Sequence, residues 1–156
     1  NVCDYFQHWL EMERTSADAS KLPKIYFVNW FRKTADGKFM WPGFGDNSRV
    51  LKWICQRIEG KVQAHVTPIG NLPLAKDIDL SNNEGKAGFT VDPQMLAEIL
   101  KVDAEGWKKE IRTIGESYDE YDAKASKGSK VRSATARRVP KALRDVLASL
   151  TAALGK

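Results

Sequence analysis

Asn29-Trp-Phe-Arg-Lys-Thr-Ala-Asp-Gly-Lys-Phe-Met-Trp-Pro-Gly-Phe-Gly-Asp-Asn-Ser-Arg-Val50 is the stretch of sequence that decides how this chain folds. Its Asp36-Gly37 pair predicts a tight hairpin turn, because glycine accepts the positive φ that such turns demand. Further along, Gly43 and Gly45 bracket Phe44 in a loop where the backbone can approach a ligand closely. The stretch therefore predicts a hairpin, a glycine-rich loop and a helix start, one after the other.

Three phenylalanines of this stretch are candidates for binding a planar base: Phe31, Phe39 and Phe44. The turn and the loop would bring their flat rings to the start of a helix, where a base could be stacked and held. The first backbone N–H groups of that helix have no partner inside it and favour an anion or a ring acceptor. The alternative is that the three rings form a small satellite core with Trp30 and Trp41. The residues alone leave both interpretations open.

Helices and one strand are predicted around this stretch. Apolar residues at helical spacing from Tyr5 to Leu10, with Phe6 and Trp9 on the same face, indicate an N-terminal helix. β-branched and aromatic residues over positions 24–31 are typical of a largely buried strand. Good N-cap residue types at positions 46–48, followed by an apolar face up to Gly60, predict the next helix.

The rest of the chain divides into a loop-rich connection over residues 61–91 and a helix-rich end over residues 92–156. Proline, glycine and asparagine punctuate the connection. Asp92-Pro93 begins one helix, Asp103 caps another and Pro140 begins the last. Together with a helix, hairpin and pocket unit over residues 1–60, this order predicts an α+β fold.

Composition and charge indicate one globular domain. The 156 residues are 42% hydrophobic and 29% charged, which suffices for a core. No apolar run approaches the roughly 18 to 20 residues of a membrane helix, so we expect no membrane partner. The net charge of +5 is local, because seven basic and no acidic residues lie within residues 123–141. This basic segment, predicted as a loop over 123–139, lacks an aromatic ring to stack on bases, so we expect a solvated loop and no nucleic-acid partner.

Several catalytic chemistries have no counterpart in the sequence. It contains no Gly-x-x-x-x-Gly-Lys-Ser/Thr phosphate loop. The two histidines, His8 and His65, lack the spacing of a metal site. Cys3 and Cys55 have no Cys-x-x-Cys spacing, and we expect them to be reduced and buried. We therefore expect neither catalytic residues nor metal ligands in this chain, and no phosphoryl transfer or hydrolysis by the chain alone.

The stretch from Phe27 to Trp53 resembles the guanine-binding region of the GTP-dependent phosphoenolpyruvate carboxykinases. The matching segments are Phe27-Val-Asn-Trp-Phe-Arg32 and Gly37-Lys-Phe-Met-Trp-Pro-Gly-Phe-Gly-Asp-Asn-Ser-Arg-Val-Leu-Lys-Trp53. The first half of the chain is similar to the family closely, and the C-terminal helices mainly in pattern. In that family, phenylalanines at three of these positions enclose the guanine, and the segment that follows the third contacts its polar edge. The resemblance thus assigns guanine binding to Phe31, Phe39, Phe44, Gly45, Asp46 and Asn47.

The resemblance implies that residues 1–156 are the C-terminal portion of the nucleotide-binding lobe of a larger α/β enzyme. That enzyme would be a decarboxylating lyase of gluconeogenesis, converting oxaloacetate and GTP to phosphoenolpyruvate, GDP and CO₂. We expect it to be cytoplasmic and monomeric and to use Mn²⁺ and Mg²⁺. Its phosphate loop, its metal ligands and its sites for oxaloacetate and phosphoenolpyruvate would lie N-terminal to this region. The present chain would hold the base.

Two departures and one alternative accompany the resemblance. Asp46 stands where the family usually carries glutamate, and we expect little effect because the charge is kept. The basic loop from Lys124 to Arg138 looks longer than its family counterpart, so the resemblance assigns it no role. The alternative is a stand-alone guanine-nucleotide-binding module without catalysis. In either case the Asn47 amide and nearby backbone must discriminate guanine from adenine, since stacking is indifferent to base identity.

Overall fold

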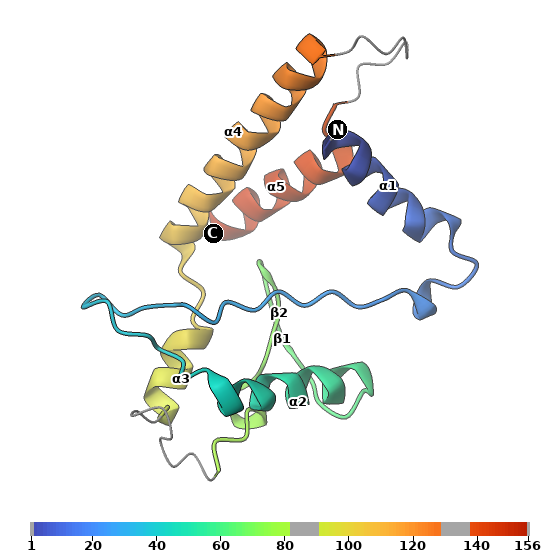
Figure 1. Cartoon of the computed structure of the whole chain (residues 1–156). Coiled ribbons are helices and arrows are strands. Elements are labelled where there is room, and N and C mark those ends of the chain that lie inside the picture. Colours follow the sequence, from blue (N-terminus) through green and yellow to red (C-terminus); the bar gives the residue numbers. More distant parts are fainter. Residues whose placement is uncertain (1, 82–90, 129–137, 156) are drawn as a thin grey trace. The chain divides into compact units, whose positions relative to one another are not determined.

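The computed structural model describes residues 2–81, 91–128 and 138–155 of the chain. They form a helix-rich structure with one small antiparallel sheet, which agrees with the predicted α+β class (Figure 1). The chain divides into two compact units, one of residues 24–102 and the other of residues 1–23 with 103–156. In the described parts, no helix has the length and apolar character needed to cross a membrane.

In its described residues, the unit of residues 24–102 contains two α-helices, two short strands and two single turns of 3₁₀-helix. These are η2 (Phe44–Asp46), α2 (Asn47–Ile58), β1 (His65–Thr67), β2 (Gly70–Leu72), η3 (Ala75–Asp77) and α3 (Pro93–Leu100). Strands β1 and β2 pair antiparallel, with His65 opposite Leu72. Within the connection predicted to be loop-rich over 61–91, these six residues form strands that the sequence did not predict. Residues 82–90 lie outside the described residues.

The core of this unit is built around two buried tryptophans. Trp41 and Trp53 cluster with Ile78, Val91 and Leu96, and the Tyr26 ring meets Trp53 edge to face at 6.2 Å. At the start of α3 the Asp92 carboxylate accepts a hydrogen bond from the backbone N–H of Met95 at 2.7 Å, which confirms the predicted N-cap. Trp41 lies just before the glycine-rich loop, and Trp53 lies on α2. Because both are buried in this core, the core holds the loop and the start of α2 in place.

The strand predicted over residues 24–31 is not formed as a strand. The segment is extended, but no other described segment pairs with it along a ladder. The predicted hairpin is correspondingly reduced to a single bridge between Lys33 and Phe39 around the Asp36-Gly37 turn. Side chains still alternate as in a strand: Tyr26 and Trp30 pack on the core, while Phe27 is 94% exposed. The alternation of residue types predicted the extended backbone. A strand also needs a neighbouring strand to which it can hydrogen-bond, and the alternation does not specify one.

The other unit is helical and packs around aromatic contacts. Its elements are α1 (Val2–Thr15), η1 (Ala19–Lys21), α4 (Ala104–Gly128) and α5 (Lys141–Leu154). Phe6 of α1 meets Tyr118 and Tyr121 of α4 edge to face at 6.1 and 6.3 Å. The predicted face of α1 is only partly correct, because Tyr5 and Trp9 are exposed and pair with each other instead.

The N-terminal part of the predicted basic loop is helical. Helix α4 runs to Gly128, and Lys124 forms an ion pair one turn away with Glu120 at 3.0 Å. Pairing of opposite charges one turn apart favours the helix as far as Lys124. Residues 129–137 of that predicted loop lie outside the described residues.

The two cysteines lie in different environments. Neither forms a disulfide within the described residues. Cys3 is buried, and burial raises the pKa of its thiol. Cys55 is exposed, so the expectation of burial was wrong for it; its position on α2 points away from the tryptophan core.

Candidate base-binding site

The Asp36-Gly37 turn brings Phe31 and Phe39 together. The backbone N–H of Gly37 donates a hydrogen bond to the backbone carbonyl of Thr34 at 3.0 Å. Gly37 has a φ of 84°, which a residue with a side chain rarely adopts. The turn folds the chain back so that the two phenylalanine rings lie 6.3 Å apart with an interplanar angle of 62°. Both rings are largely exposed, at 73% for Phe31 and 48% for Phe39. They form an aromatic surface and not a packed core.

Arg32 ties this aromatic turn to helix α3. Its guanidinium donates from Nη1 to the backbone carbonyl of Ile99 at 2.7 Å. A second guanidinium nitrogen lies 3.9 Å from the Glu98 carboxylate. Arg32 directly follows Phe31 in the chain and is anchored on a helix of the same unit. This anchor limits how far Phe31 can move.

Phe44 lies at the tip of the glycine-rich loop in an unusual backbone conformation. Gly43 has a φ of 76°, and Phe44 itself has a φ of 48°, the one positive value at a non-glycine residue in the described chain. For a residue with a side chain this costs about 1–2 kcal/mol. The ring is 88% exposed, so burial does not compensate for the strain. A strained, exposed aromatic side chain is typical of a binding position.

The aromatic residues of the stretch therefore divide into two groups. Trp41 is buried and Trp30 packs against the core, as the satellite-core interpretation expects. Phe31, Phe39 and Phe44 are exposed, as a stacking surface requires. Among the ring contacts of the described residues, Phe44 has none with the other two phenylalanines.

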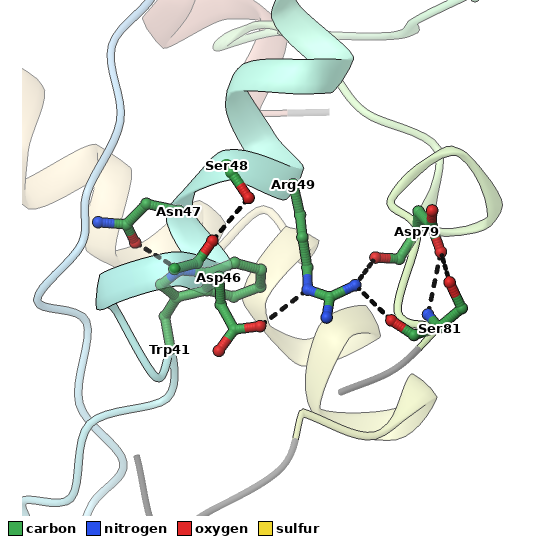
Figure 2. Close-up of polar contacts among 8 residues, drawn as sticks. Trp41, Asp46, Asn47, Ser48, Arg49, Asp79 and Ser81 are labelled. Atoms are coloured by element: carbon green, nitrogen blue, oxygen red, sulfur yellow. Dashed lines mark hydrogen bonds and ion pairs between the residues drawn. The ribbon is translucent and has the colours of Figure 1, made fainter. Parts of the chain in front are cut away.

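Asp46 and Asn47 form the junction between η2 and α2, and each side chain has a fixed partner (Figure 2). Asp46 occupies the N-cap position but makes no side-chain cap hydrogen bond. Its carboxylate instead accepts from Nε of Arg49 at 2.8 Å, with both side chains less than 20% exposed. The amide oxygen of Asn47 accepts a hydrogen bond from the indole N–H of Trp41 at 2.9 Å. The predicted capping role of Asp46 is thus replaced by an ion pair.

Arg49 is the residue of this site that the sequence did not reveal. Beyond Asp46, its Nη1 donates to the backbone carbonyls of Asp79 and Ser81, the latter at 2.8 Å (Figure 2). The spacing of Asp46 and Arg49 by three residues could have suggested the ion pair. The carbonyl acceptors are about thirty positions further along the chain. The spacing of apolar residues in the sequence does not predict contacts over such a separation. Arg49 therefore joins the start of α2 to the segment 79–81.

Asp79 continues this network on the far side of Arg49. Its carboxylate accepts from the Ser81 hydroxyl, from the Ser81 backbone N–H at 3.0 Å and from Lys52 Nζ at 3.0 Å. The hydrogen bond from the Ser81 hydroxyl, with smaller effects of Lys52, lowers the pKa of the Asp79 carboxyl well below its usual range. The segment after η3 is thereby held against α2.

Metal ligation is not supported by the described residues. No three His, Cys, Asp or Glu side chains among them lie close enough together to hold a metal ion. The acidic groups at the start of α2 and in segment 79–81, Asp46 and Asp79, pair with Arg49 and Lys52. The arrangement can stack a planar ring and offer polar groups to its edge.

Comparisons with known proteins identify the family. Residues 1–138 match the family model described as the phosphoenolpyruvate carboxykinase C-terminal P-loop domain. A protein of Renibacterium salmoninarum named phosphoenolpyruvate carboxykinase [GTP] is 48% identical over 118 residues, which cover 76% of this chain and 18% of the relative. A protein of the same name from Treponema pallidum subsp. pallidum is 43% identical over 153 residues, covering 97% of this chain and 21% of the relative. The chain thus spans about a fifth of the length of these curated relatives. On this evidence, the chain belongs to the GTP-dependent phosphoenolpyruvate carboxykinase family and falls within its C-terminal domain.

Proposed function

We propose that this chain supplies the guanine-binding pocket of a GTP-dependent phosphoenolpyruvate carboxykinase. The observations that carry the proposal are the exposure of all three phenylalanines and the Asn47 amide that Trp41 fixes at the start of α2. Contact of an apolar ring with water is unfavourable, and a stacked ligand would remove it. A flat base with a polar edge fits both the rings and the amide. Relatives named for this GTP-dependent enzyme support the same assignment.

In this proposal the site residues act on the base and not on the phosphates. Phe31, Phe39 and Phe44 enclose the guanine, and Gly45, Asp46 and Asn47 face its polar edge. The backbone of Gly45 is open, with no atom within 4 Å of where a β-carbon would stand, so a ring could approach it closely. Asp46 acts through Arg49, which holds the loop in place.

The reaction of the whole enzyme belongs to the same proposal. Oxaloacetate and GTP would be converted to phosphoenolpyruvate, GDP and CO₂, with gluconeogenesis in the cytoplasm as the setting and a monomer as the working form. Mn²⁺ and Mg²⁺ would supply charge stabilisation for decarboxylation and phosphoryl transfer. Their ligands are not found in the described residues, so no step of the chemistry is assigned to this chain. The names of the relatives do not favour the alternative of a stand-alone binding module.

A titration of GDP against ADP tests the proposal. Tryptophan emission of the 156-residue chain reports binding, because in the sequence Trp30 adjoins Phe31 and Trp41 lies between Phe39 and Phe44. We expect a guanine-selective response that Phe44→Ala weakens about 5- to 150-fold, the range for losing one base–aromatic stack.

Phe27→Ala is the matched control. Phe27 is even more exposed than Phe44, at 94%, but lies in the extended segment before the turn. Its loss should leave the affinity for GDP unchanged. Equal responses to GDP and ADP, or equal losses in the two variants, would contradict the assignment of the pocket.

A further inference from the structure

The hydrogen bond between Trp41 and Asn47 determines which polar group the site can offer to a base. We infer that Trp41 is a positioning residue for base selectivity: its indole N–H fixes the Asn47 amide so that the amide nitrogen, and not the oxygen, faces the 6-position of the purine. This inference rests on the proposed function, because it concerns the same pocket.

The chemistry of the indole decides the orientation of the amide. An indole N–H can only donate a hydrogen bond, whereas an asparagine amide has an oxygen that accepts and a nitrogen that donates. The group 2.9 Å from Trp41 Nε1 must therefore be the amide oxygen. Figure 2 shows the amide nitrogen of Asn47 pointing away from the indole ring. Within the described residues this nitrogen makes no hydrogen bond, so its two N–H donors are available.

The anchor of this hydrogen bond is rigid. Trp41 is 7% exposed and belongs to the buried cluster that includes Trp53 and Leu96, so its ring cannot turn to follow a moving amide. The backbone around Asn47 is also held. The Ser48 hydroxyl donates to the carbonyl of Gly45 at 2.6 Å, and Arg49 pairs with Asp46 on the other side. A flipped amide would place an N–H group against the indole N–H, leaving two donors without acceptors.

A fixed donor discriminates between the two purines at their 6-position. Guanine carries an oxygen there, which accepts a hydrogen bond, whereas adenine carries an amino group, which donates. The Asn47 N–H would pair with the guanine oxygen and would oppose the adenine amino group. A freely turning amide could present its oxygen to adenine instead, so the indole contributes to selectivity by excluding that orientation.

The test compares two tryptophan substitutions in the same core. Trp41→Phe keeps an aromatic ring but removes the N–H donor. Trp53→Phe is the matched control, because Trp53 is 3% exposed in the same cluster and its buried indole nitrogen has no hydrogen-bond partner among the described residues. Calorimetric titration of the 156-residue chain gives the dissociation constants for GDP and ADP in each variant. Urea unfolding of each variant shows whether the fold is retained.

We expect the ratio of the ADP constant to the GDP constant to fall about tenfold in Trp41→Phe, the effect of one released hydrogen bond. The ratio should stay unchanged in Trp53→Phe. A ratio that is unchanged in Trp41→Phe, with both nucleotides weakened equally, would overturn the inference and leave Trp41 a structural residue. A wild-type chain that does not distinguish GDP from ADP would instead contradict the proposed function itself.

Asn47→Asp provides a second test that leaves the core intact, should Trp41→Phe fail to fold. One carboxylate oxygen can still accept from Trp41, and the other places an acceptor where the amide nitrogen stood. Repulsion between the new charge and the phosphates affects GDP and ADP alike and cancels in their ratio. We expect the ratio to shift toward ADP by tenfold or more. An unchanged ratio would overturn the inference.

Discussion

Replacing Phe44 by glycine should separate binding from folding at this site. The φ of 48° at Phe44 costs an L-residue about 1–2 kcal/mol, and glycine adopts it without that cost. Two terms oppose this gain. Glycine makes the unfolded chain more flexible, at about 0.5–1 kcal/mol, and the 88% exposed ring loses little burial, at about 0.6 kcal/mol for some 25 Å². The sum lies within about 1 kcal/mol of zero.

The Phe44→Ala variant makes the comparison sharp. Alanine removes the same ring but keeps the backbone strain, so the glycine variant should be more stable than the alanine variant by about 0.5–1 kcal/mol. Both should lose GDP affinity to the same extent, about 1–3 kcal/mol for one stacked base. Urea unfolding by linear extrapolation and GDP titration of the same samples measure the two effects. The reasoning is refuted if the glycine variant retains wild-type affinity for GDP, or if it loses more than about 2 kcal/mol of stability.

Three further predictions concern the network and the turn beside the pocket. Arg49→Lys keeps the charge but loses the planar fork that contacts Asp46 and two carbonyls, so urea unfolding should show a loss of about 1–2 kcal/mol; wild-type stability would contradict the network. The lowered pKa of the Asp79 carboxyl stabilises the fold above the unfolded pKa of 3.8, and this contribution disappears as the pH falls through the lower folded pKa. The difference in unfolding free energy between wild type and Asp79→Asn should therefore be constant near neutral pH and vanish in acid. A difference that persists in acid would contradict the assignment. Gly37→Ala should lower the free energy of unfolding by about 1 kcal/mol because of the φ of 84° at Gly37, whereas Gly115→Ala, in open space on α4, should raise it by about 0.5–1 kcal/mol. Thermal unfolding compares the two variants, and equal shifts of their midpoints would contradict the role of the turn.

Local chemistry was sufficient to predict most of the helices. Asp92 caps α3, and the Asp103 carboxylate accepts from the N–H of Gly106 at 2.9 Å at the start of α4, as expected from residue types within one helical turn. The Asp36-Gly37 turn is likewise local. In each case the deciding interaction joins residues at most four positions apart, so a short window of sequence contains the information.

The errors concern distant contacts and short elements that a local window of sequence does not specify. Residues 24–31 have the alternation of a strand, but a strand also requires a hydrogen-bonded neighbour, and the sequence of the segment does not specify one. Strands β1 and β2 were missed because three residues each is too short for a periodic pattern. Arg49 was missed because its carbonyl acceptors at Asp79 and Ser81 depend on how segment 79–81 folds back onto α2. Position in the chain gave no indication of that contact.

The proposed function also accounts for the large differences in exposure among the candidate site residues. Stacking tolerates movement, since a ring can slide over a base at little cost, and Phe44 can therefore lie 88% exposed on a strained loop. Discrimination between O6 of guanine and the amino group of adenine does not tolerate movement, because a rotation of one amide exchanges donor for acceptor. In the proposed pocket Asn47 has that task, and its amide accepts a hydrogen bond from a tryptophan that is 7% exposed. Affinity can thus reside in exposed rings, whereas selectivity requires a connection to the core.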